Sequence, residues 1–165
     1  MDIHLFIKSP ADGLGLNTLA IYGNEKPKAA IVFIHGLCGK IERMLPTMRH
    51  FADQGYACIG FDMRGHGDSI KTEEDRGYTY HGGSKAMVED IKAVIGWIEE
   101  NFPKTPIFIV AHSMGSLAAR TYLKSDDTHI NGLVLCGSPS YNPLSPYARI
   151  FLQVYNEITG GHDRL

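Results

Sequence analysis

The residues with the clearest chemical potential lie in the stretch Ala111-His112-Ser113-Met114-Gly115, which follows the apolar run Ile107 to Val110. The run is typical of a buried strand and the residues after Ser113 are typical of a helix, so the two elements meet with almost no loop. A serine on such a turn projects from the end of a sheet, where a base can accept its proton and the next backbone N–H can face a developing oxyanion. Because a serine after a strand is more often a helix cap, the pentapeptide needs support from the rest of the chain.

Small residues flank Ser113, as this turn requires. We expect the strand and the helix to pass too closely for a large side chain at Ala111 or Gly115. Ala111 stands where the pattern G-x-S-x-G has its first glycine, so the local pattern is A-x-S-x-G. Alanine fits the packing but tolerates a positive φ less well than glycine.

A second turn of chemical interest follows the apolar run Ala29 to Ile34. His35-Gly36 ends this run, and one interpretation of this pair is an ordinary turn with no chemical role. If Ser113 is a nucleophile, however, a glycine loop after a neighbouring strand must supply a second oxyanion donor. We therefore predict that the backbone N–H groups of Leu37 and Met114 form the pair.

The polar loop Asp62-Met63-Arg64-Gly65-His66-Gly67-Asp68-Ser69 offers competing interpretations. A dinucleotide fingerprint is disfavoured, because its third glycine would fall at Ile70 and no helix with an acidic ribose partner is indicated there. Asp62 and Arg64 fit a structural brace of the loop better than a catalytic acid. His66 and His112 are better explained as packed, hydrogen-bonded side chains than as bases.

The remaining chain supplies elements that position these turns. An antiparallel hairpin at a sheet edge is followed by strands that alternate with amphipathic helices, which predicts a doubly wound α/β sheet. Ligands of such sheets lie outside the carboxyl ends of the parallel strands, and every unusual loop of this chain falls there. The expected strands are 3–7, 16–22, 29–34, 56–61, 107–110 and 130–137, and the expected helices are 44–54, 84–100, 114–124 and 147–158.

Composition indicates one globular domain. The chain has 165 residues, of which 44% are hydrophobic and 21% charged, with a formal net charge of -2, so no basic face for nucleic acid is expected. There is neither a signal-peptide pattern nor an apolar run near the roughly 18 residues of a membrane span, which predicts a cytoplasmic protein. The three cysteines, Cys38, Cys58 and Cys136, fit free thiols rather than a zinc site or disulfides, and no metal or cofactor is expected.

Taken in order, the motifs resemble those of the α/β-hydrolase superfamily. His35-Gly36, then Asp62-x-Arg64-Gly65-His66-Gly67-x-Ser69, then the Ser113 pentapeptide each follow a strand, and the chain looks like the lysophospholipase and monoacylglycerol lipase branch, which is grouped with serine aminopeptidases. The resemblance implies a mostly parallel sheet with helices on both faces. It also implies that Ser113 is the nucleophile, that Leu37 and Met114 form the oxyanion hole, and that Gly36, Cys38 and His112 adjoin the substrate.

The triad pattern of that family breaks after Ser113, because the acid and histidine expected downstream are not found. His129 precedes the strand 130–136, which at about 3.3 Å per residue places it roughly 20 Å from the mouth of the site. His162, with Glu157 or Asp163 as a partner, is on the correct side but lies in a glycine-flanked tail. We therefore expect a truncated hydrolase, with residues 1–140 as part of the core and 141–165 as the start of a lid.

The predicted parent function is hydrolysis of a small-molecule carboxylic ester with an apolar acyl group, through an acyl-serine intermediate. A peptidase or amidase on the same scaffold is one alternative. The other is a non-catalytic fragment that associates with another chain or with itself through the exposed edge of strand 130–136. At most trace activity is expected of the isolated chain.

Overall fold

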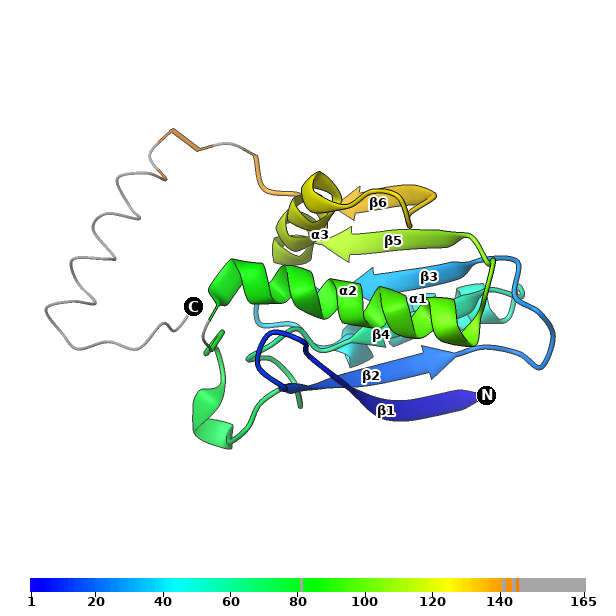
Figure 1. The fold of residues 1–165 in the computed structure, drawn as a ribbon, viewed down its shortest axis with the longest axis horizontal. Coiled ribbons are helices and arrows are strands. Elements are labelled where there is room, and N and C mark those ends of the chain that lie inside the picture. The colour runs from blue at the N-terminus through cyan, green and yellow to red at the C-terminus, as the bar shows by residue number, and fades with distance from the viewer. Residues whose placement is uncertain (81, 141, 144, 146–165) are drawn as a thin grey trace, which may run out of the picture.

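Six strands form one mixed sheet, in the order β1-β2-β4-β3-β5-β6 (Figure 1). This computed structural model describes residues 1–80, 82–140, 142, 143 and 145. The two antiparallel strands β1 and β2 make the predicted hairpin at one edge, and the other four strands run parallel. The strands are β1 (Asp2–Lys8), β2 (Gly15–Ile21), β3 (Ala30–Ile34), β4 (Ala57–Phe61), β5 (Ile107–His112) and β6 (Gly132–Cys136).

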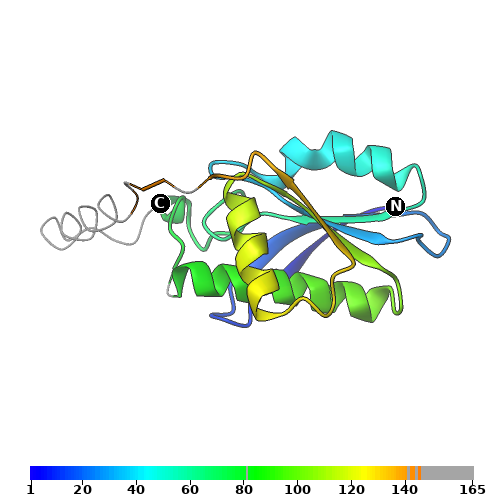
Figure 2. The ribbon, with the colours of Figure 1, turned by 90° about the horizontal axis from the view of Figure 1, so that it is seen from above.

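Helices cover both faces of the sheet, as predicted. Figure 2 shows α1 on one face and both α2 and α3 on the other. The helices are α1 (Leu45–Ala52), α2 (Gly83–Asn101) and α3 (Met114–Ser125), with short 3-10 turns η1 (Ile41–Met44) and η2 (Glu73–Asp75). The helix expected at 44–54 is shorter than predicted, because a 3-10 turn precedes it and Pro46 lies in its first turn.

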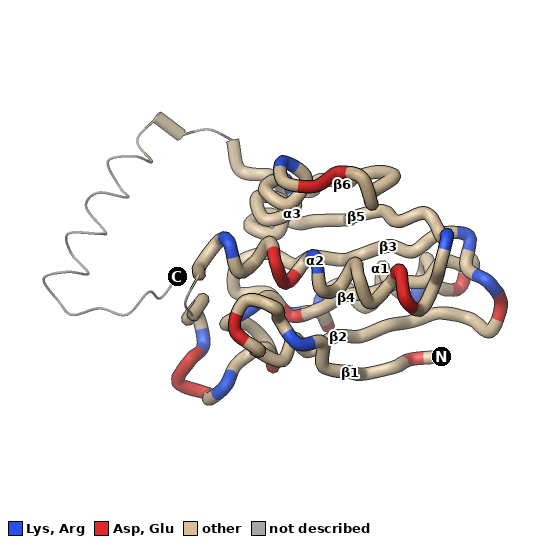
Figure 3. Tube along the Cα trace, viewed as in Figure 1, with Lys and Arg blue, Asp and Glu red and all other residues tan. Residues whose placement is uncertain are grey.

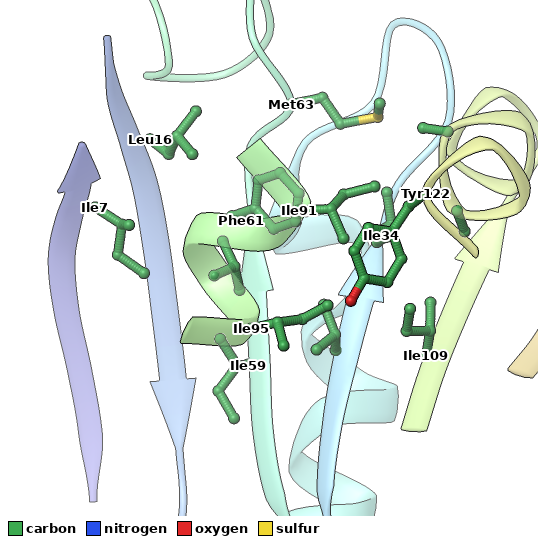
Figure 4. Close-up of a cluster of buried hydrophobic side chains, with 14 of the residues drawn as sticks. Ile7, Leu16, Ile34, Ile59, Phe61, Met63, Ile91, Ile95, Ile109 and Tyr122 are labelled. Carbon is green, nitrogen blue, oxygen red and sulfur yellow. The ribbon is translucent and has the colours of Figure 1, made fainter. Parts of the chain in front are cut away.

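Two apolar clusters fill the space between the sheet and these helices. The larger cluster joins the sheet to α2 and α3, where Ile34, Ile91 and Tyr122 are fully buried (Figure 4). The smaller cluster lies under α1 and contains Phe33 and Met48. Burial of this apolar surface is what holds each helix in its place over the sheet.

Strand register brings the predicted turns together. Ile34 is level with Phe61 on one side and Ala111 on the other, and His112 is level with Cys136. The loops that leave β3, β4, β5 and β6 therefore start from the same edge of the sheet.

Strand β6 lies at the other edge of the described sheet. Val134 and Leu135 on this strand are 52% and 38% exposed, which agrees with the expected exposed edge. The lid expected from residue 141 onward lies outside the described residues, except for three positions. None of the described helices is long and apolar enough to cross a membrane.

Candidate active site

Ser113 occupies the sharp turn between β5 and α3. Its backbone has φ 50° and ψ -118°, a conformation that L residues rarely adopt. The turn is held from both sides, because Ser113 N–H donates to the Cys136 carbonyl at 2.9 Å and the Ser113 carbonyl accepts from Ser116 N–H at 2.9 Å. The Ser116 hydroxyl also donates to the Ala111 carbonyl at 3.0 Å. These contacts hold a strained conformation in a fixed place, which is typical of a functional residue.

Close packing explains why small residues flank this turn. A Cβ atom added at Gly115 would lie 2.5 Å from the His35 carbonyl oxygen and 2.8 Å from the Ile34 carbonyl oxygen. Ala111 is fully buried. The steric requirement predicted from the sequence at these two positions is confirmed.

The Ser113 side chain remains free to react. It is half-buried and makes no hydrogen bond to another described residue. Met114 is the first residue of α3, so its N–H has no partner four residues earlier within the helix. A free hydroxyl and a free N–H thus adjoin at the start of the helix.

A tight turn from Gly36 to Gly39 lies directly beside Ser113. Gly39 N–H donates to the Gly36 carbonyl at 3.0 Å, and Cys38 between them has a φ of 54°. A Cβ added at Gly36 would lie 2.9 Å from Ser113 Cβ and 3.0 Å from His112 Nδ1. Of the three positions predicted to adjoin the substrate, Gly36 and His112 therefore lie beside the serine, and Cys38 lies in the turn that begins at Gly36.

His35 fixes the orientation of the Gly36–Leu37 peptide. Its Nδ1 lies 2.7 Å from the Gly36 carbonyl oxygen, and its Nε2 lies 2.9 Å from the Met63 backbone nitrogen. Since Met63 N–H can only donate, Nε2 accepts and the proton is on Nδ1. The peptide is trans, so the N–H of Leu37 points away from the carbonyl that His35 holds.

The Leu37 N–H makes no hydrogen bond to another described residue. Burial lowers the pKa of His35, which keeps the ring neutral and able to accept from Met63. From the sequence, His35 was predicted only to belong to the turn. A His-Gly pair after a strand does not reveal which backbone groups the ring will reach.

The loop after β4 is a structural brace, as predicted. Asp62 accepts hydrogen bonds from the backbone of Ile41 at 2.8 Å and Asp68 at 2.9 Å. Arg64 is fully buried and pairs with Asp90 of α2 at 2.7 Å and with Asp12 of the hairpin turn at 3.1 Å. This loop, which also holds Met63, is thereby anchored to two distant parts of the fold.

Three other histidines with sequence-based expectations differ in burial and in their contacts. His66 is buried, with Nδ1 3.1 Å from the Arg64 carbonyl oxygen and its ring 5.4 Å from that of His35. His112 is exposed at the end of β5, so the expectation that it is packed is wrong for this side chain. His129 contacts Glu99 at 2.5 Å at the amino end of the sheet, far from the mouth in strand register.

The candidate triad partners named from the sequence, His162, Glu157 and Asp163, lie outside the described residues. Among the described residues, no histidine hydrogen-bonds to Ser113, and no three side chains are arranged to hold a metal ion.

Two hollows flank the turn from Gly36 to Gly39. The first has a volume of about 380 Å³ and the second about 450 Å³. Leu37, Gly39 and Arg43 line both. The first is also lined by His35, Gly36, Met44, Thr47, Val110, His112 and Cys136, and the second by Cys38, Lys40, Gly65, His66, Gly67, Arg76 and Gly77.

Comparison with known proteins adds independent findings. Residues 25–161 match the family model described as serine aminopeptidase, S33. The chain is 35% identical over 109 residues to a probable lysophospholipase L2 of Haemophilus influenzae, covering 64% of this chain and 34% of that protein. It is 30% identical over 98 residues to the lysophosphatidylserine lipase ABHD12 of Mus musculus, covering 58% of this chain and 22% of that protein.

A solved structure of similar fold is a thermostable carboxyl esterase from Bacillus coagulans. It superposes with a TM-score of 0.85 at 25% identity, over 94% of this chain and 51% of the esterase. The chain thus spans about half of this structure, and about a third and a fifth of the two curated relatives.

Proposed function

The chain belongs to the serine aminopeptidase S33 family of α/β-hydrolases, in its lysophospholipase-like branch, and from this premise we propose that it acts in carboxylic ester hydrolysis with Ser113 as the nucleophile. The observation that carries the proposal is the strained turn at Ser113, where the hydroxyl and the adjoining Met114 N–H have no partner among the described residues. The turn that contains Leu37, whose N–H also has no described partner, lies directly beside it. This is the arrangement that acyl transfer requires.

In the proposed reaction, Ser113 Oγ attacks the ester carbonyl carbon while a base accepts the hydroxyl proton. The carbonyl oxygen becomes an oxyanion, which accepts hydrogen bonds from Leu37 N–H and Met114 N–H. Collapse of this intermediate expels the alcohol, which takes the proton, and leaves an acyl-Ser113 ester that water hydrolyses to the free acid. Loss of one such oxyanion donor typically lowers the rate by about 10² to 10³.

The general base must come from outside the described residues. A serine is a weak nucleophile without one, and no described histidine contacts Ser113. His162 stays the sequence candidate. We therefore expect slow reaction of the isolated chain with electrophiles, confined to Ser113.

The first hollow suits an apolar acyl group. Leu37, Met44 and Val110 line it beside the turn that carries the oxyanion donor. This supports an acyl ester over an amino-acid amide as substrate, although the family description names an aminopeptidase. Turnover rates measured for monoacyl esters and for amino-acid amides distinguish the esterase from the peptidase. Faster turnover of the amides would favour the peptidase.

A fluorophosphonate probe with intact mass and peptide mapping tests the nucleophile. We expect slow, substoichiometric labelling that maps to Ser113 and disappears in Ser113→Ala. Ser125→Ala is the matched control, because this hydroxyl lies at the far end of α3 and only donates to the Tyr122 carbonyl at 2.7 Å. Equal labelling of the parent and Ser113→Ala would refute the proposal, and rapid stoichiometric labelling would refute the expected slow reaction.

A further inference from the structure

The turn from Gly36 to Gly39 is called the oxyanion turn below, because it contains Leu37. The charged residues that line the second hollow, beside this turn, are all cations. Lys40, Arg43 and Arg76 are part of the lining, and no aspartate or glutamate is. Figure 3 shows Lys and Arg interspersed with Asp and Glu along the backbone, whereas the lining of this hollow holds cations and no acids. An opening of about 450 Å³ with this charge is suited to an anion.

Arg43 is the one cation among the lining residues of the second hollow that also lines the first. It lies in η1 and lines both hollows, so it stands beside the turn that carries Leu37 N–H. Its guanidinium makes no ion pair or hydrogen bond to another described residue. A guanidinium presents several N–H donors in one plane, a geometry that matches two oxygens of a phosphate.

The other two cations are held loosely by acids that lie outside the lining. Lys40 is 3.4 Å from Glu42, and Arg76 is 2.7 Å from Glu73, with all four side chains between 48% and 74% exposed. Exposed pairs of this kind contribute only about 0–1 kcal/mol, so a doubly charged ligand can compete for the cations.

Arg76 has a further contact that sets its position. One of its Nη atoms donates to the Gly67 carbonyl at 2.8 Å, which holds the guanidinium over the loop that forms the far wall. Asp62 and Asp68 also lie near this cation and add to its stabilisation. Arg76 therefore serves as a rim charge, whereas Arg43 has donors to spare.

We propose that this hollow is the subsite for the phosphate group of a phosphate-bearing acyl ester, which rests on the ester hydrolysis proposed above. With the acyl chain in the first hollow and the ester carbonyl at Leu37 N–H, the alcohol part of the substrate lies toward the second hollow. In a lysophospholipid, the phosphate follows the ester within a few covalent bonds along the glycerol. A monoacylglycerol has no charge to place there, so the subsite selects the phospholipid.

Phosphate binding can be measured without catalysis. Inorganic phosphate and glycerophosphocholine are titrated separately into the ¹⁵N-labelled chain, and the amide signals of Gly39 and Gly67 are followed, with that of Gly23 as a distant reference. We expect saturable shifts at the first two residues with both ligands. Arg43→Gln should raise the Kd about tenfold, the effect of one lost hydrogen bond between charged groups.

Arg49→Gln is the matched control, because it removes the same charge from α1, where Arg49 pairs with Asp2 in an exposed position. Its Kd should equal that of the parent chain. Equal Kd values for Arg43→Gln and the parent, or no shift at Gly39 and Gly67, would overturn the proposal. Binding of inorganic phosphate without glycerophosphocholine would identify a free-phosphate site and overturn the head-group assignment.

Steady-state kinetics separate this proposal from the proposed hydrolysis. The ratio of KM for a lysophospholipid to KM for the monoacylglycerol of the same acyl chain should rise about tenfold in Arg43→Gln and stay unchanged in Arg49→Gln. Loss of Ser113 labelling with intact phosphate binding would refute only the hydrolysis. Ser113-specific labelling with a ratio that does not depend on Arg43 would refute only the subsite.

Discussion

Replacing His35 tests whether the ring orients the oxyanion turn. His35→Ala removes two contacts, the bond to the Gly36 carbonyl at 2.7 Å and the acceptor for Met63 N–H at 2.9 Å. The side chain is 3% exposed, so water cannot replace either partner without entering the loop. Two effects are therefore expected, one on stability and one on the reaction of Ser113.

The two effects differ in size. Leaving Met63 N–H without an acceptor in a buried place should lower the free energy of unfolding by about 1–3 kcal/mol. The Gly36 carbonyl keeps its bond from Gly39 N–H, so the Leu37 peptide is loosened rather than released. Labelling of Ser113 should therefore slow by about tenfold, which is less than the 10² to 10³ typical of a lost oxyanion donor.

Two conservative variants divide these effects. In His35→Asn, the amide nitrogen can take the place of Nδ1 and donate to Gly36, which should restore the labelling rate. In His35→Gln, the longer side chain can place its oxygen near the position of Nε2 and accept from Met63, which should restore stability. The assays are urea unfolding and the initial rate of fluorophosphonate labelling at Ser113.

The pH dependence follows from the neutral state of the ring. Burial lowers the pKa of His35 from the ordinary value of 6.5, so the unfolded chain binds more protons just below this pH. The stability that His35 contributes is present above about pH 6.5 and is lost as the pH falls through the lowered pKa of the folded protein. Unfolding free energy should thus fall more steeply below pH 6.5 in the parent than in His35→Asn.

A folded His35→Ala that labels at the parental rate would refute the role given to the ring. Equal labelling rates for His35→Asn and His35→Gln, both slower than the parent, would refute the division between the two nitrogen atoms.

Three further predictions follow from the same geometry. In urea titrations, the free energy of unfolding should be about 1–3 kcal/mol higher for Ser113→Gly than for Ser113→Ala. Both variants lack the hydroxyl, but only glycine adopts the positive φ without strain. Equal free energies would contradict strain at this turn. Gly115→Ala should lower the melting temperature and slow Ser113 labelling, because the added Cβ would lie 2.5 Å from the His35 carbonyl oxygen. A variant that matches the parent in melting temperature and labelling rate would show that α3 can move away. Alkylation of the folded protein should modify the exposed Cys38 and Cys136 but not Cys58, as detected by mass spectrometry. Cys58 is buried, and burial raises its pKa to about 12. Modification of Cys58 at the rate of the other two would refute its burial.

Much of this architecture could be predicted from local sequence patterns. The apolar runs that became β3 and β4 are continuous because those strands are buried on both faces. The run that became β5 is equally apolar, but this strand is buried on one face only, and its Phe108 is 37% exposed. The abrupt change at Ser113 from an apolar run to a helical pattern predicted the turn, and the sizes of Ala111 and Gly115 predicted its close packing. The brace formed by Asp62 and Arg64 was also predicted, although not its partners.

Those partners lie far along the chain, which is why only the fold could identify them. Arg64 reaches Asp90 and Asp12 because α2 and the hairpin turn converge on one loop, and no periodicity encodes that meeting. The exposure of the His112 side chain likewise depends on which elements pack around the end of β5.

The sequence by itself determined which residue types stand at the carboxyl ends of the strands, because each turn follows its own apolar run. Tertiary structure alone decided how they face one another. Strand register placed Gly36 against Ser113, and the contact of His35 with Met63 set the direction of a single peptide. The cationic hollow likewise exists only because η1 and the loop after β4 meet across the oxyanion turn, since charges separated in sequence form a site only when the backbone brings them to one place.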